Sequence, residues 1–153
     1  MEKSDASEFI VVDLDIISRS SLLPLSNFFG KRVITLCNEW RSERTYYLSV
    51  EPDVRSRRSS SPEKEILFLL NLVESLPSPL EVLWTKAYSR TFDIGFRGGQ
   101  MSSDPNDPGL TTIPACRHDL SPATILLLGK LKATIRITVY PYDSDSCLPT
   151  KPD

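Results

Sequence analysis

One stretch decides the fold: residues Phe9–Ile17, whose sequence is FIVVDLDII. Its even-numbered residues are all aliphatic, and its odd-numbered residues include two aspartates, Asp13 and Asp15. This alternation with a period of two predicts a strand that buries one face. We expect the even-numbered side chains, from Ile10 to Ile16, in the core. Strands covered on both faces are apolar on both, so this pattern favours a sheet with helices on one face only.

Similar patterns along the chain predict four more strands and four helices. The strands are expected at Arg32–Trp40, Thr45–Glu51, Arg90–Arg97 and Ala133–Tyr140. Serine followed by proline marks three helix starts, at Ser61, Ser78 and Ser121, because serine caps a helix and proline fits its first turn. A shorter helix is expected from Ser20 or Ser21 to about Phe29. In the last helix and the last strand, the side chains expected to face inward are Ile125, Leu128, Leu131, Ile135, Ile137 and Val139.

The element order β-α-β-β-α-α-β-α-β predicts an α+β fold. We expect a two-layer sandwich, with a mixed five-stranded sheet that carries helices on one face. Residues 8–141 are expected to form a single domain, with residues 1–7 and 142–153 as flexible tails.

The composition excludes several classes of protein. The 153 residues are 40% hydrophobic and 25% charged, as in ordinary globular domains, and the net charge of −2 gives no basic excess for nucleic acid. No apolar run approaches the roughly 20 residues of a membrane span, and no signal peptide is evident. We therefore expect a cytoplasmic protein without membrane contact. The single histidine and three scattered cysteines, read as free thiols, predict no cofactor and no metal site of the zinc type.

The side chains opposite the apolar ones are expected on the face of the sheet that the helices leave open. They give this face a polar and locally acidic character. The candidate binding residues on it are Asp13, Asp15, Tyr47, Glu51, Asp93, Arg136 and Tyr140.

Three interpretations of this face stay open. It can be a solvated surface without a binding role, as antiparallel sheets allow. It can dock a basic protein partner, since carboxylates steer a cationic surface and tyrosine is a frequent interface anchor. Alternatively, Asp13, Asp15 and Asp93 can converge on a divalent metal ion for phosphoryl or glycosyl chemistry.

Two loops complete the candidate sites. Residues 55–58 (RSRR) form a short basic run that could contact nucleic acid, although nearby acidic residues dilute its charge. The long loop 98–119 could serve as an adjustable rim beside the sheet.

Four segments carry a resemblance to a protein family: Val11–Ile16, Phe92–Gly95, Leu120–Thr124 and Ala133–Tyr140. In these segments and in element order, the chain resembles a group of small uncharacterised bacterial α+β proteins. That group is similar in outline to the cytosolic immunity proteins that accompany polymorphic or contact-dependent toxins. The resemblance implies a binding protein, not an enzyme, that neutralises a toxin by occluding it. A cationic toxin domain would suit the acidic face. The alternatives are an enzyme that uses a divalent metal at the three aspartates, and nucleic-acid contact through residues 55–58.

Overall fold

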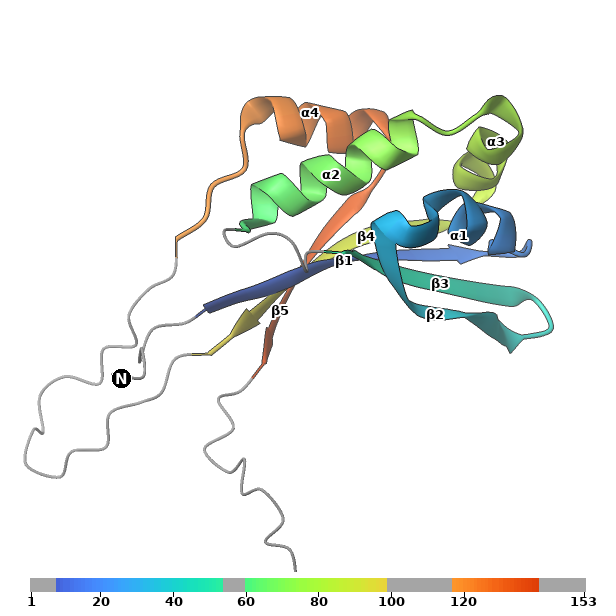
Figure 1. Ribbon diagram of the computed structural model, residues 1–153, viewed down its shortest axis with the longest axis horizontal. Coiled ribbons are helices and arrows are strands. Elements are labelled where there is room, and N and C mark those ends of the chain that lie inside the picture. Colours follow the sequence, from blue (N-terminus) through green and yellow to red (C-terminus); the bar gives the residue numbers. More distant parts are fainter. Residues whose placement is uncertain (1–7, 54–59, 99–116, 141–153) are drawn as a thin grey trace, which may run out of the picture.

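The computed structural model describes residues 8–53, 60–98 and 117–140, and these form the expected α+β fold (Figure 1). The strands are β1 (Glu8–Ser18), β2 (Val33–Ser42), β3 (Thr45–Pro52), β4 (Ser89–Arg97) and β5 (Thr134–Tyr140). The helices are α1 (Leu23–Phe29), α2 (Pro62–Glu74), α3 (Ser78–Lys86) and α4 (Pro122–Lys130), with a 3₁₀ turn at Gly30–Arg32. The expected tails, the basic run 55–58 and most of loop 98–119 lie outside the described residues.

The five strands form one sheet in the order β2-β3-β1-β4-β5. All neighbours are antiparallel except β4 and β5, which are parallel, so the sheet is mixed as predicted. The four helices lie on the same side of this sheet (Figure 1). The two-layer arrangement with one open face is therefore confirmed.

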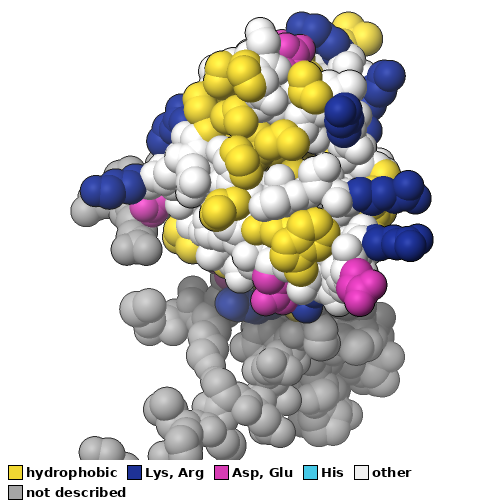
Figure 2. All heavy atoms as spheres, turned by 90° about the vertical axis from the view of Figure 1, so that its right-hand side faces the viewer, with side chains coloured by type: hydrophobic (Ala, Val, Ile, Leu, Met, Phe, Trp, Pro, Cys, Tyr) yellow, Lys and Arg dark blue, Asp and Glu magenta, His cyan; other side chains and the backbone are white. Residues whose placement is uncertain are grey.

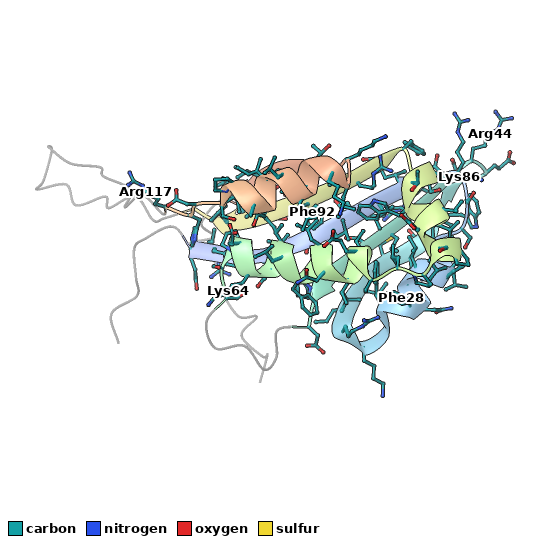
Figure 3. All side chains as sticks on the ribbon, turned by 90° about the horizontal axis from the view of Figure 1, so that it is seen from above. Phe28, Arg44, Lys64, Lys86, Phe92 and Arg117 are labelled. Carbon is teal, nitrogen blue, oxygen red and sulfur yellow. The ribbon has the colours of Figure 1, made fainter. Side chains whose placement is uncertain are left out.

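The central strand β1 holds the core together. Val12, Leu14 and Ile16 have no exposed surface, and they point toward the helix layer. Leu14 lies opposite Val50 on β3 and Phe92 on β4, both fully buried. Phe92 sits beneath the helices near the middle of the molecule (Figure 3). Burial of such side chains is the main source of stability in a sheet packed on helices.

The expectation for Ile10 was wrong. The pairing of β1 with β4 shifts between Phe9 and Val11, so a β-bulge interrupts the alternation. An extra residue in a strand moves the residues before it to the opposite face. As a result Ile10 is 41% exposed, and Phe9 packs edge-on against Phe96 beside the core.

The inward face of α4 also differs from the prediction. Thr124 and Leu128 are buried, whereas Ile125 is 54% exposed. The reason is that α4 packs beside α2. This packing turns Thr124 and Leu128, which lie one helical turn apart, toward the interior. On β5, the side chains of Ile135, Ile137 and Val139 lie on the helix side as expected, but α4 leaves them exposed.

The helix caps were predicted in part. The hydroxyls of Ser61 and Ser121 accept hydrogen bonds from the backbone amides of Lys64 and Thr124, at 3.4 and 3.2 Å. Ser78, in contrast, is the first residue of α3, and α1 begins after Leu22 without a side-chain cap.

Within the described residues, no single helix is long and apolar enough to cross a membrane. Taken together, α2 and α3 are long and apolar enough by length and composition alone, but a bend of 120° separates the two helices.

Candidate functional site: the open face of the sheet

All seven candidate residues lie on the face of the sheet opposite the helices. Strand pairing sets them side by side, since Asp13 lies opposite Asp93 and Asp93 lies opposite Arg136. We call this surface the open face. Its polar side chains from β1, β3, β4 and β5 include Asp13, Asp15, Tyr47, Ser49, Glu51, Asp93, Arg136, Thr138 and Tyr140.

Asp15 is the most connected side chain of the open face. Its Oδ1 accepts hydrogen bonds from the hydroxyls of Tyr47, at 2.8 Å, and Ser49, at 2.7 Å. Its Oδ2 lies 3.6 Å from Nη1 of Arg136. Burial, and then the hydrogen bond to Asp15, raise the pKa of the Tyr47 phenol to about 12. This phenol therefore keeps its proton at neutral pH and acts as a fixed donor.

Asp93 forms the second half of the network. Its Oδ1 accepts a hydrogen bond of 2.7 Å from Thr138, and its Oδ2 lies 3.4 Å from Nη1 of Arg136. The same guanidinium thus bridges Asp15 and Asp93, whose side chains are only 13% and 16% exposed. Arg136 itself is 57% exposed, so a cation stands outermost over these two carboxylates.

Asp13 has a different environment from its neighbours. Its Oδ1 is buried and has no hydrogen-bond partner within the described part of the chain. Burial, followed by repulsion from Glu51, Asp15 and Asp93, raises the pKa of this carboxyl from 3.8 to about 7. Near neutral pH, Asp13 can therefore donate a hydrogen bond when protonated or accept one when ionised.

Glu51 and Tyr140 complete the candidate residues of the open face. Burial and the nearby carboxylates of Glu65 and Asp53 raise the pKa of Glu51. Tyr140 is 49% exposed, and its ring edge crosses Gly95, where an added Cβ would stand 3.4 Å from the ring. The Tyr140 ring therefore packs in van der Waals contact over the backbone of β4 at Gly95.

The sequence interpretation missed the contribution of β2. Arg41 lies 3.1 Å from the carboxylate of Glu39, donates to Sγ of Cys37 at 3.2 Å and stacks over the ring of Tyr47 at 5.2 Å. Register shifts on both sides of Cys37–Trp40 change the phase of β2, so alternation alone could not assign these residues to a face. Ser49 was missed as well, and its position opposite Asp15 required the strand register.

The carboxylates of the open face are not grouped like the ligands of a metal ion. Among residues 8–53, 60–98 and 117–140, no three His, Cys, Asp or Glu side chains are grouped so that they could hold a metal ion. The Arg136 guanidinium occupies the place between Asp15 and Asp93 where a cation would bind. The network is therefore suited to recognition through hydrogen bonds and charge.

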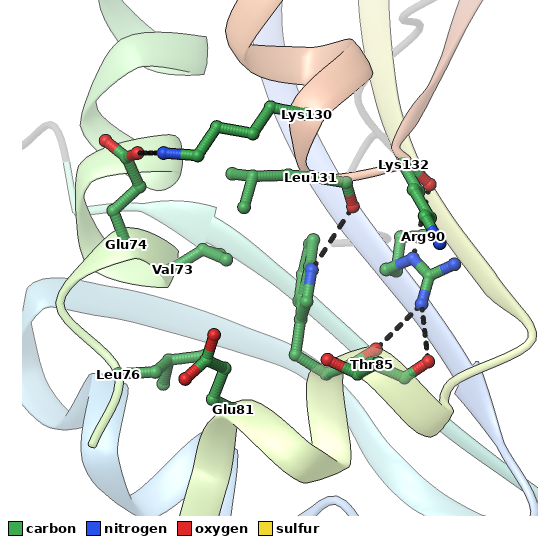
Figure 4. Close-up of a pocket in the computed structure, with 10 residues that line it drawn as sticks. Val73, Glu74, Leu76, Glu81, Thr85, Arg90, Lys130, Leu131 and Lys132 are labelled. Carbon is green, nitrogen blue, oxygen red and sulfur yellow. Dashed lines mark hydrogen bonds and ion pairs between the residues drawn. The ribbon is translucent and has the colours of Figure 1, made fainter. Parts of the chain in front are cut away.

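A small cavity lies elsewhere, where α2, α3, the end of α4 and the start of β4 meet (Figure 4). It has a volume of about 280 Å³ and includes the ion pair between Glu74 and Lys130, at 3.0 Å. Arg90 donates to the carbonyls of Trp84 and Ala87, at 2.7 and 2.8 Å. Since Glu74, Lys130 and Arg90 already bind partners within the chain, these three side chains link neighbouring elements and are not free to hold a ligand.

A shallow groove lies at the end of the molecule that carries the β2–β3 turn. Figure 3 places Arg44 and Lys86 together at this end, and Figure 2 shows Lys and Arg side chains projecting from its edges. All residues that line the groove can donate hydrogen bonds: Ser18, Arg19, Ser20, Arg44, Thr45, Lys86 and Tyr88. The groove therefore suits an anionic group, and its positive charge is opposite to the charge of the acidic open face.

No family model, no curated protein and no solved structure matches this chain. The functional argument therefore rests on the geometry of the open face.

Proposed function

We propose that this chain is a small binding protein that docks a protein partner on its open face, and that it acts in the cytoplasm without an enzymatic activity of its own. The observation that carries the proposal is the cross-strand network in which Arg136 bridges Asp15 and Asp93. These side chains come from three strands and are held by neighbours on a rigid sheet. A surface fixed in this way loses little conformational entropy when a partner binds.

The chemistry of the open face selects a basic partner. Four carboxyl groups, of Asp13, Asp15, Glu51 and Asp93, share this surface with Arg136 of β5. Two further arginines of this face, Arg41 and Arg97, each lie beside a glutamate of their own, Glu39 and Glu8. A cationic partner surface would be steered toward it and would shift Asp13 to its ionised form. Tyr47 and Tyr140 supply aromatic area of the kind that anchors protein interfaces.

The resemblance to immunity proteins suggests what this partner is. In that proposal, the partner is a cationic toxin domain, and the open face blocks it by occlusion. A toxin must be held tightly to be neutralised, and both the prearranged carboxylates and the exposed Tyr140 favour slow dissociation.

The test compares two tyrosines of similar exposure. Tyr140, 49% exposed, lies on the open face, and Tyr88, 56% exposed, lies in the groove at the hairpin end. Protein captured from source cells by the wild-type chain should be lost with Tyr140→Ala and kept with Tyr88→Ala. The same comparison holds for Glu51→Lys against Glu81→Lys on α3. Circular dichroism confirms that each variant folds.

The outcomes separate the candidate functions. Loss of the partner only with the open-face variants, and weaker capture at higher salt, supports docking by charge. The immunity role further requires that the captured protein is toxic when expressed alone and harmless when expressed with this chain. Equal capture by Tyr140→Ala and Tyr88→Ala would remove the open face as the binding site. A rise in thermal stability with Mg²⁺ or Mn²⁺ would favour the metal-dependent alternative.

A further inference from the structure

Strand β5 forms one edge of the sheet and carries unusual apolar exposure. Its parallel partner is β4, and no other described strand pairs with it. On its helix side, Ile135, Ile137 and Val139 are 37%, 65% and 64% exposed. An exposed, regular and apolar edge strand is a template for pairing with another chain.

The opposite edge of the sheet is protected in a way that β5 is not. Register shifts interrupt β2 twice, and charged side chains of Glu39 and Arg41 stand on it. Bulges and charges of this kind are common defences against edge pairing. Strand β5 has no register shift in its pairing with β4, contains no proline and has one charged residue, Arg136, which is turned to the open face. The difference between the two edges indicates that β5 is built to be paired.

The backbone of β5 offers its free groups at the apolar residues. The carbonyl of Tyr140 accepts a hydrogen bond of 2.8 Å from the amide of Gly98, so Tyr140 directs its backbone toward the β4 side. Backbone groups alternate in direction along a strand. The amide and carbonyl of Ile137 therefore point away from β4, as do those of Ile135 and Val139.

We propose that β5 pairs with β5 of a second copy of this chain, antiparallel and centred on Ile137. In this register Ile137 lies opposite itself, Ile135 opposite Val139, and Arg136 opposite Thr138. All three pairs match apolar with apolar or polar with polar, and Ile137 becomes a hydrogen-bonded pair. A register centred on Arg136 would instead set two guanidinium groups directly opposite each other, which is unfavourable.

A second copy fits this edge better than an unrelated strand for reasons of symmetry and charge. Antiparallel pairing about a two-fold axis is self-complementary, so each apolar side chain meets an apolar one. Arg136 is already paired with Asp15 and Asp93, so no unpaired charge opposes the approach. Ile125 and Leu126 on α4, 54% and 74% exposed, extend the apolar surface in the helix layer. The dimer would have one continuous sheet, with both open faces on the same side and both free.

Cysteine cross-linking tests the register directly. In a chain with Cys37→Ser, Cys116→Ser and Cys147→Ser, Ile137→Cys should form a disulfide-linked dimer, because a hydrogen-bonded pair has a Cα separation of about 5.5 Å. Val139→Cys alone should not, since two copies of residue 139 would be about 13 Å apart along the strand. A mixture of Ile135→Cys and Val139→Cys chains should cross-link as a heterodimer. Equal cross-linking of Ile137→Cys and Val139→Cys would overturn the register.

Sedimentation over a range of concentrations tests the dimer itself. The wild-type chain should associate, and Ile137→Lys should weaken association at least tenfold, whereas Val82→Lys on the exposed side of α3 should not. Ile137→Pro is a second variant, because it removes an amide that points away from β4 and so leaves the β4 pairing intact. A wild-type chain that stays monomeric overturns the proposal, and so does association that neither Ile137 variant weakens. Partner capture through Tyr140 is measured separately, so the dimer proposal can be overturned while the docking proposal stands, and the reverse.

Discussion

Glu65 on α2 accepts a hydrogen bond of 2.8 Å, through its Oε2, from the backbone amide of Val12 on β1. The Glu65 side chain is 1% exposed, so a carboxylate lies within the layer between helix and sheet. The Val12 amide, which donates this hydrogen bond, belongs to the strand segment just after the bulge at Ile10. This contact gives the interrupted strand a partner for a backbone group that would otherwise be buried without one.

We expect Glu65→Ala to lower the free energy of unfolding by about 2–3 kcal/mol, because it leaves a buried backbone donor unsatisfied and opens a cavity. Glu65→Gln keeps an acceptor oxygen and should cost less than Glu65→Ala. Urea denaturation followed by circular dichroism measures both. The exposed Glu81→Ala is the matched control and should change stability by less than 0.5 kcal/mol or so. Equal effects of Glu65→Ala and Glu81→Ala would contradict a role for the Val12 contact.

The pH dependence of stability should depend on Asp13. Its pKa is raised in the folded protein, from 3.8 to about 7, so its contribution to stability is present below pH 4 and is lost as the pH rises to 7. Asp13→Asn removes the charge. At pH 4 the variant should match the wild type, and at pH 8 it should be more stable by about 1–2 kcal/mol, less than the full shift implies because the carboxyl is partly solvated.

Thermal unfolding at several pH values measures this difference. The stability of Asp13→Asn relative to wild type should increase between pH 4 and pH 7 and then level off. The matched substitution Asp119→Asn, at an exposed position before α4, should show no such trend. A constant difference between Asp13→Asn and wild type over the whole range would contradict the raised pKa.

Much of the fold could be predicted because local signals agree along most of the chain. Alternation in Phe9–Ile17 and the serine–proline starts of α2 and α4 identify elements that depend on few distant contacts. Ile10 and Ile125 were misplaced because a bulge and the packing angle of a helix are set by tertiary contacts. These contacts leave no periodic signal in the sequence.

The candidate site was predictable to the same degree. Residues such as Asp15 and Asp93 could be assigned to one face, since clean alternation fixes the face of a strand. Which of them pair could not be predicted, because the bridge through Arg136 depends on β5 lying parallel to β4. Arg41 could not be assigned at all, because the register of β2 shifts before Cys37 and again at Arg41, between Trp40 and Ser42.

Two helix caps that share the serine–proline pair should differ in strength. Ser61 caps α2 through Lys64, whereas Ser121 caps α4 and also donates from its hydroxyl to Glu63 Oε1 at 2.7 Å. The hydrogen bonds from Thr124 and Ser121 lower the pKa of Glu63, which shows that the carboxylate form is favoured there. We expect Ser61→Ala to cost about 1 kcal/mol and Ser121→Ala clearly more, since Ser121 also links α4 to α2.

Denaturant unfolding at neutral pH compares the two serine variants. Lowering the pH until Glu63 is protonated should reduce the difference between them, because the charged acceptor of Ser121 is then lost. Equal destabilisation by Ser61→Ala and Ser121→Ala at neutral pH would mean that the link to Glu63 adds nothing to the cap.

Arg90 should link α3 to the turn between α4 and β5, which contains Lys132. Its Nη1 donates to the carbonyls of Trp84 and Ala87, and its Nε donates to the carbonyl of Lys132 at 3.3 Å. Lysine cannot reproduce this planar set of donors, so Arg90→Lys should lower the free energy of unfolding by about 1–2 kcal/mol. The indole of Trp84, which donates to the carbonyl of Leu131 at 3.3 Å, should gain solvent exposure.

Fluorescence in a Trp40→Phe background reports on Trp84 alone, since the chain has two tryptophans. Arg90→Lys should shift its emission to longer wavelength, because Trp84 is 4% exposed in the intact protein and its environment would become more polar. Arg97→Lys, at a 56% exposed arginine of the same strand, should leave both the emission and the stability unchanged. An unshifted spectrum and wild-type stability in Arg90→Lys would show that the carbonyl contacts of Arg90 do not hold α3 against the turn before β5.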